Sequence, residues 1–207
     1  MTTPPGELTA AEPYVIVVER PRKRRWPWVI GGLAALALVC CLGAIAVWTP
    51  IGKEYPAYIE LGDKPAGLDR VSDPEVDRAS AELVAQMFRK YNVDDGDAAL
   101  LADPAVRERR VILIAATKLI LDPKGELDKA VSDVADRPIR DLTDYSHLGV
   151  TLKCANTEDD ENHAVIICAW IDHGSIGLGI YYGTWTMDTS ANLLRDLRAA
   201  VVRRGQR

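Results

Sequence analysis

The sequence predicts an α+β fold: a mostly antiparallel sheet with helices packed on one of its faces. Two patterns support this prediction. Along 148–154 and 176–182, apolar residues alternate with small or polar residues, as in half-buried strands. Along 76–88 and 193–201, apolar residues recur at helical spacing instead. The expected order over residues 72–207 is helix, strand, strand, helix, three strands and helix (α-β-β-α-β-β-β-α).

The first helix is expected to begin at Ser72 or Asp73, either of which can cap the helix before Pro74. It should end near Asn92. Its apolar stripe comprises Val76, Ala79, Leu83, Val84, Met87 and Phe88. The acidic stretch 94–97 that follows resembles a calcium loop, but it lacks the ligand spacing and terminal Glu of an EF-hand. A solvated turn is therefore expected there.

The middle of the chain is expected to hold a buried strand and a second helix. Residues 111–117 are apolar on both faces and rich in β-branched side chains, which favours a strand. One continuous helix over 105–121 is the competing interpretation. The sequence Asp122-Pro123 then predicts a helix over 123–136, which Arg137-Pro138 would end.

The last 60 residues are expected to form three strands and a helix. The strands cover 148–154, 163–171 and 176–182, with a turn at 172–175. The helix should open at Asp188, Thr189 or Ser190. Its expected inner face is Leu193, Leu194, Leu197, Ala200 and Val201, and its expected outer face is Arg195, Asp196, Arg198, Arg203 and Arg204.

The hairpin register follows from the position of two cysteines. Cys154 and Cys168 are symmetric about Glu161 in the acidic loop 156–162, so a hairpin that turns there places them opposite each other. Together with an oxidising compartment, this predicts a disulfide. The same symmetry places His147 opposite Ser175.

The two faces of the sheet receive different side chains. In the next hairpin Trp170 should lie against Gly177. The helices are expected to cover Val165, Ile171, Ile176, Leu178 and Ile180. The opposite face would carry the disulfide, Trp170, Leu152 and Val150, and the linker or a partner would have to cover it.

The N-terminal part of the chain is organised around residues 28–48, a run of 21 residues without charge. A helix of that length crosses a bilayer, and Trp28 and Trp48 stand at its ends. Five basic residues occupy 20–25, which predicts a cytoplasmic N-terminus and an extracytoplasmic remainder. The chain would thus be a single-pass protein of the cell membrane, with the lipid bilayer as its partner from Trp28 to Trp48.

The predicted organisation has four parts. A disordered basic cytoplasmic arm covers 1–25, the transmembrane helix 26–48, a linker 49–71 and the extracytoplasmic domain 72–207. A cleaved signal is the alternative, because residues 44–46 have the small-x-small form that signal peptidase recognises. A lipoprotein is disfavoured, since Val39 and Cys40 precede the cysteines where a small residue is needed. Cys40 and Cys41 are expected to be apolar residues of the span.

Charge restricts the partners of the outer domain. After residue 49 the chain carries 20 basic and 27 acidic residues, a net charge of −7. An acidic domain disfavours nucleic acid as a partner. No motif predicts a cofactor.

Three segments of the sequence resemble a group of membrane proteins with the same predicted organisation. The sequences CAWIDHGSIGLGIYY at 168–182, LLRDLRAAVVRR at 193–204 and DPKGELDKAV at 122–131 resemble a group of uncharacterised actinobacterial single-pass membrane proteins. These have a proline-rich N-terminus and a Cys-paired extracytoplasmic α+β domain. The resemblance covers about two-thirds of the chain and implies no activity or catalytic residues.

One candidate site follows from the register. It would gather His147, Asp172, His173 and Ser175 at one end of the sheet. Two imidazoles and a carboxylate can bind zinc, and Ser, His and Asp can form a nucleophilic triad. However, hairpin turns use the same residue types, and no catalytic motif or metal-ligand pair surrounds them, so neither a catalytic residue nor a metal ligand is assigned.

Three functions are therefore weighed. The first is an envelope module that binds another envelope protein or a small ligand. The second is an exported metal-dependent or hydrolytic enzyme that uses the candidate site. The third is a structural part of a membrane complex, in which Gly31, Gly32 and Gly43 let helices pack closely, although Gly31 and Gly43 lack GxxxG spacing.

Overall fold

The computed structural model describes residues 38–43, 48–127, 139–159 and 162–205. The chain divides into two units, residues 1–43 and 44–207. The basic arm 1–25 and most of the predicted span 28–48 lie outside the described residues. Residues 38–43 and 48–54 are helical. Within the described residues, no helix combines the length and the apolar character needed to cross a membrane.

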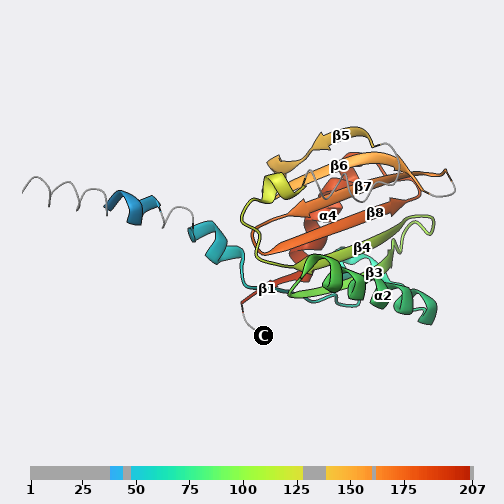
Figure 1. Ribbon diagram of the computed structural model, residues 1–207. Helices are drawn as coiled ribbons and strands as arrows, with labels where there is room; N and C mark the ends of the chain where they lie inside the picture. Colours follow the sequence, from blue (N-terminus) through green and yellow to red (C-terminus); the bar gives the residue numbers. More distant parts are fainter. Residues whose placement is uncertain (1–37, 44–47, 128–138, 160–161, 206–207) are drawn as a thin grey trace, which may run out of the picture. The chain divides into compact units, whose positions relative to one another are not determined.

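The second unit is an α+β domain built on a seven-stranded antiparallel sheet (Figure 1). The strand order is β2-β3-β4-β8-β7-β6-β5. The strands are β2 (Asp69–Arg70), β3 (Asp95–Ala102), β4 (Arg110–Thr117), β5 (Arg140–Asp144), β6 (Thr151–Glu158), β7 (Ala164–Ile171) and β8 (Ser175–Tyr182). The strands β5 to β8 form a meander, and the β4–β8 pairing joins it to the strands β2, β3 and β4.

The residues expected to form a linker, 49–71, are largely part of this domain. They contain β1 (Ala57–Ile59), a 3-10 turn η1 (Pro65–Gly67) and β2. β1 pairs with β9 (Val202–Arg204), close to the C-terminus. Ile59 and Leu68 are buried in the main core. The linker prediction was wrong here because short strands of three and two residues leave no periodicity to recognise.

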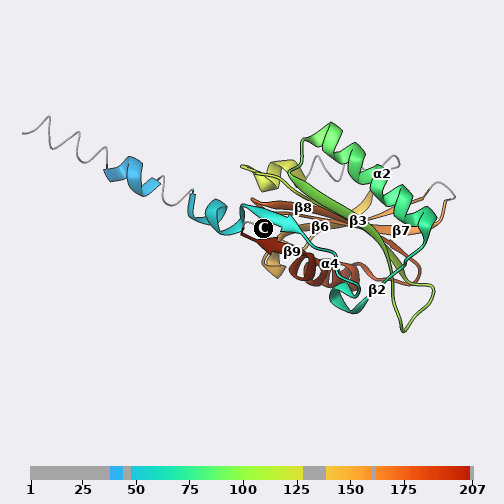
Figure 2. The ribbon, with the colours of Figure 1, turned by 90° about the horizontal axis from the view of Figure 1, so that it is seen from below.

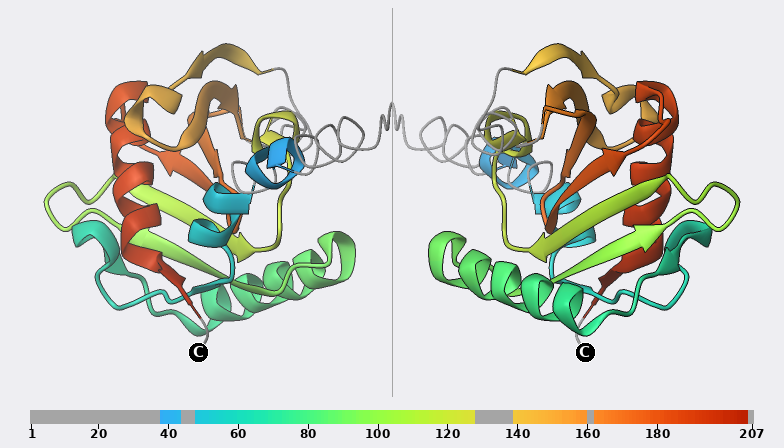
Figure 3. Two further views of the ribbon diagram at one scale, coloured as in Figure 1. Left: turned by 90° about the vertical axis from the view of Figure 1, so that its left-hand side faces the viewer. Right: turned by 90° about the vertical axis from the view of Figure 1, so that its right-hand side faces the viewer.

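Two long helices flank the sheet on opposite faces (Figure 2). The helix α2 (Pro74–Tyr91) lies against β3, and the helix α4 (Met187–Val201) lies against β6, β7 and β8. The end views of Figure 3 show the same arrangement. The prediction that helices cover one face only was therefore wrong.

The assignment of the two faces was also reversed for α4. This helix covers the face that carries Trp170 and the cysteines. Two glycines make room for it: a methyl group at Gly177 would collide with the Trp170 ring, and one at Gly179 would meet Tyr181 and Leu194. Leu178 and Ile180 lie on the other face, and both are only partly buried.

The ends of the helices show where local signals suffice. Asp73 caps α2 and accepts a hydrogen bond from the Glu75 N–H at 2.8 Å, as expected. The helix α4 begins earlier than expected, because Thr186 and Thr189 form a reciprocal capping box. It also ends earlier, so Arg203 and Arg204 belong to β9 and not to the outer face of the helix.

Most expected strands are present. β4 confirms the strand over 111–117 against the helical alternative. β6 begins only at Thr151, since 146–148 form the 3-10 turn η2 (Ser146–Leu148). The prediction of a solvated turn over 94–97 was wrong, because residues 95–97 are the first residues of β3 and pair with β4. The strand β5 was not predicted. All five of its residues are exposed, and Leu142 is the single apolar residue among them, so they show no alternation of apolar and polar residues. Residues 123–127 begin the expected second helix, and residues 128–136 lie outside the described part.

The predicted hairpin register is confirmed over the strands. Cys154 pairs with Cys168, their Cα atoms are 4.0 Å apart, and the disulfide is formed. Trp170 pairs with Gly177. The extension to His147 was wrong: pairing between β6 and β7 ends at Thr151 and Ile171, because the chain turns at Asp172. Ser175 pairs with Thr117 of β4 instead.

Candidate functional site

The turn between β7 and β8 holds a buried polar network centred on Asp172. Its side chain is only 7% exposed. The Oδ1 atom accepts hydrogen bonds from the backbone N–H groups of Gly174 at 2.8 Å and Ser175 at 2.6 Å. The Oδ2 atom accepts one from the Ser175 hydroxyl at 2.9 Å. A carboxylate with this many donors is well compensated for its burial.

The counter-charge comes from α4. The guanidinium of Arg198 donates to Asp172 Oδ2 from Nε at 2.8 Å and also from a terminal nitrogen. The Arg198 side chain is only 15% exposed, so its predicted place on the outer face of the helix was wrong. An ion pair in such a buried position ties α4 to the β7–β8 turn, and removing either partner would leave an uncompensated charge.

Ser175 connects this pair to the core. Its hydroxyl donates to Asp172 and accepts a hydrogen bond from Trp170 Nε1 at 3.1 Å. Ser175 is fully buried, and so is Trp170. The hydroxyl therefore has a carboxylate and an indole as its partners, and neither of them is an imidazole.

His173 points away from that network toward the loop after β4. Its Nδ1 atom lies 2.9 Å from the carbonyl oxygen of Ile120. A carbonyl can only accept, so the proton of this hydrogen bond is on Nδ1. The backbone N–H of His173 donates to Glu54 Oε2 at 2.8 Å. The residue thus joins three segments that are distant in sequence.

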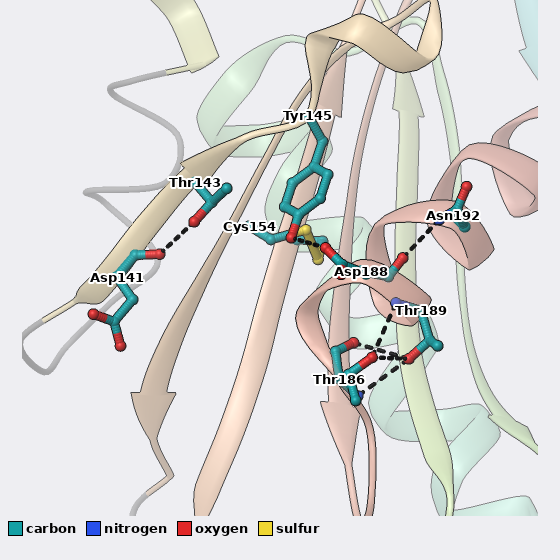
Figure 4. Close-up of a disulfide and its surroundings, with 9 residues drawn as sticks. Asp141, Thr143, Tyr145, Cys154, Thr186, Asp188, Thr189 and Asn192 are labelled. Carbon is teal, nitrogen blue, oxygen red and sulfur yellow. Dashed lines mark hydrogen bonds between the residues drawn. A yellow bond between two sulfur atoms is a disulfide. The ribbon is translucent and has the colours of Figure 1, made fainter.

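His147 lies in η2, and its side chain is exposed. Its ring is 5.9 Å from the ring of Tyr145. Tyr145 donates a hydrogen bond from its hydroxyl to Asp188 Oδ1 of α4 at 2.6 Å, beside the disulfide of Cys154 (Figure 4). Burial, followed by the hydrogen bond to Asp188, raises the pKa of Tyr145 to about 12.

The four candidate residues therefore separate into three environments. Asp172 and Ser175 meet, His173 turns to Ile120, and His147 lies in an exposed turn. In the described part of the chain, no group of three or more His, Cys, Asp and Glu side chains is placed to hold a metal. The arrangement assembles neither a hydrogen-bonded Ser–His pair nor a metal centre, and its chemistry is that of a structural clamp.

The two residues that sequence reasoning missed are Arg198 and Glu54. A signal existed for Arg198, because it lies four residues after Leu194 and three before Val201, at the edge of the inward stripe. Nothing in the sequence indicated Glu54, because its partner is a backbone group of residue 173.

Comparison of the chain with protein-family models, with curated proteins and with solved structures finds no match in any of the three.

Proposed function

We propose that this chain is a membrane-anchored module of the cell envelope whose outer domain binds an envelope protein or a small ligand. The observation that carries the proposal is the 21-residue uncharged run 28–48 after five basic residues, followed by a disulfide-bonded domain. The bridge supports an oxidising compartment for the domain, since cytosolic thiols are kept reduced.

The binding surface we favour is the sheet face opposite α4. On this face Ile112, Ile114 and Ile180 are only partly buried, and α2 contributes no buried residue. A partly covered aliphatic face suits contact with another protein. The exported-enzyme alternative draws no support from the geometry around Asp172, because both carboxylate oxygens are engaged in the clamp.

Topology is tested with reporter fusions. Alkaline phosphatase fused after Arg207 should be active, and the same enzyme fused after Arg25 should be inactive. The reverse pattern would contradict the anchor orientation.

The binding surface is tested in intact cells with a photoreactive residue at position 114. Discrete adducts are expected there, and adding Ile112→Asp should abolish them. Leu142, on the edge strand β5 and 50% exposed, is the matched control position. Adducts at 114 that do not exceed those at 142 would contradict this surface.

A further inference from the structure

Most of the exposed large hydrophobic residues that the structure describes after Trp48 belong to segments that reach one end of the sheet. This end, called here the anchor end, is where β4 ends at Thr117 and β8 begins at Ser175. Of the described residues after Trp48, five large hydrophobic residues are exposed: Phe88 (41%), Tyr91 (44%), Leu119 (38%), Leu121 (70%) and Leu142 (50%). All but Leu142 belong to segments that reach the anchor end.

The topology places these segments there. Leu119 and Leu121 follow directly after the last residue of β4. The helix α2 ends at Tyr91, four residues before β3 begins at Asp95, and Asp95 pairs with Thr117. By contrast, Leu142 lies within β5 on the far edge of the sheet.

The segment that leaves the predicted anchor attaches to the same end. Glu54 accepts the hydrogen bond from the His173 N–H, and the backbone of Glu54 lies directly against Gly174. The Tyr55 hydroxyl donates to Asp94 Oδ2 at 3.2 Å. Figures 1 and 3 show residues 48–54 and the segment 118–127 at the same end of the sheet. Residues 48–54 are helical, so Trp48 lies only about 9 Å of helix from Glu54.

The loop 118–121 is held so that its leucines remain outside the core. Ile120 is 6% exposed and packs inward, while its two neighbours, Leu119 and Leu121, are exposed. The Ile120 N–H donates to the His173 carbonyl at 3.0 Å, and the Ile120 carbonyl lies 2.9 Å from His173 Nδ1. Both backbone polar groups of Ile120 are thus satisfied by His173 in the β7–β8 turn, which holds the loop in place.

A single exposed leucine is ordinary on a soluble surface. Here, however, a hydrogen-bonded loop presents two leucines, and the exposed aromatic side chains of Tyr91, Phe88 and Trp48 belong to segments that reach the same end. Aromatic rings of this kind are enriched where protein meets the membrane interface, and aliphatic side chains enter the acyl boundary below them.

We infer that the anchor end of the domain rests on the outer leaflet of the membrane, with Leu119 and Leu121 in its apolar layer. The inference rests on the proposed anchor, since that anchor brings this end to the bilayer. The loop is then a second membrane contact that sets the orientation of the domain. The sheet face with Ile112 and Ile114 would stand roughly along the membrane normal, open to a partner in the envelope.

The experiment uses the full chain in phosphatidylcholine–phosphatidylglycerol vesicles, with one nitroxide-bearing residue at position 121, 119, 142 or 36. Power saturation compares the accessibility of each nitroxide to oxygen, which dissolves in lipid, with its accessibility to a water-soluble nickel chelate. The ratio at 121 and 119 should exceed the ratio at 142 several-fold. Adding Leu119→Asp to the chain labelled at 121 should lower its ratio to the value at 142.

Position 36, within the predicted span, separates the two proposals. A high ratio at 36 with ratios at 121 and 119 equal to that at 142 would overturn the membrane contact and leave the anchor intact. An aqueous ratio at 36 would overturn the anchor itself. An unchanged unfolding midpoint of each labelled chain confirms that the fold is preserved, as expected for exposed positions.

Discussion

The two faces of the sheet differ although the helices that cover them have similar amphipathic stripes. On one face, α4 buries Ser190, Ala191, Leu194, Leu197 and Val201. On the other face, no residue of α2 is buried, and Ile112 and Ile114 are only partly covered. A second, smaller core on this face consists of Ile120, Leu127, Ala169 and Ile171. The α4 face also holds the disulfide, Trp170 and the Asp172–Arg198 pair.

The difference shows that an amphipathic stripe alone does not determine how deeply a helix is buried. The glycines at 177 and 179 leave a hollow that large side chains and α4 fill. The opposite face carries Ile176, Leu178 and Ile180, which are only partly buried, and Ile176 and Leu178 pack against the smaller core. The α4 face is therefore expected to carry most of the stability of the domain.

The largest expected effect is at the clamp of the α4 face. Asp172→Ala should lower the free energy of unfolding by about 3–5 kcal/mol, because it leaves Arg198 buried without a counter-charge. Urea unfolding of the full chain in detergent, followed by fluorescence, measures this. Asp196→Ala is the control: Asp196 is 55% exposed and pairs with neighbouring Arg195, so a change below about 1 kcal/mol is expected. If Asp172→Ala and Asp196→Ala lowered the free energy of unfolding equally, the Asp172–Arg198 pair would not contribute to the greater stability of the α4 face.

The next test compares the two helices directly. Leu197→Ala should cost about 2–5 kcal/mol, since Leu197 is fully buried and its loss leaves a cavity. Leu83→Ala in α2 should cost about 1 kcal/mol, because that side chain is only partly buried. Both free energies of unfolding are obtained from urea titrations that are fitted with one common m value. If Leu83→Ala lowered the free energy of unfolding as much as Leu197→Ala, α2 would be packed on the sheet as tightly as α4.

The disulfide, which lies on the α4 face, is expected to contribute about 3 kcal/mol to the free energy of unfolding. The bridge joins residues 14 apart, and a closed loop of that size restricts the unfolded chain by roughly this amount. The double variant Cys154→Ala/Cys168→Ala should lose this stability in thermal unfolding. The matched variant Cys40→Ala/Cys41→Ala should unfold like the parent chain. A loss confined to the second variant would contradict the assignment.

The smallest expected effect concerns Tyr145, which joins the edge of the α4 face to Asp188. Its pKa is raised to about 12, above the ordinary value of 10.0. Because the folded state holds this proton more tightly than the unfolded state, the stabilisation is complete below pH 10 and is lost as the pH rises toward 12. Tyr145→Phe should weaken this alkaline loss and remove one late-titrating phenol at 295 nm. Tyr58→Phe is the control; an unchanged titration in Tyr145→Phe would contradict the raised pKa.

Much of the fold could be predicted because its signals are local. The cap at Asp73, the alternation along β8 and the apolar run of β4 are all readable within a few residues. The pairing of Cys154 with Cys168 could also be predicted. In a hairpin, residues at equal distances from the turn lie opposite each other, so the symmetric spacing of the two cysteines defined the register. The same rule failed for His147, since nothing local showed that the pairing would stop at Thr151.

The candidate site was predicted in composition but not in geometry. Asp172 and Ser175 do meet, because an Asx turn brings residues i and i+3 together. The directions of His173 and Arg198 depended on Ile120 and on the docking of α4, which lie far away in sequence. Short-range spacing cannot specify such partners.

The sequence by itself determined the apolar run 28–48, the basic residues before it, the paired cysteines and the class of fold. Each is a property of composition or of short-range periodicity. Only the tertiary structure decided which face α4 covers, that residues 54–59 join the domain, and that Leu119 and Leu121 stand exposed at the anchor end. These outcomes depend on long-range packing and on hydrogen bonds to backbone groups, whose partners leave no mark on the local pattern of residues.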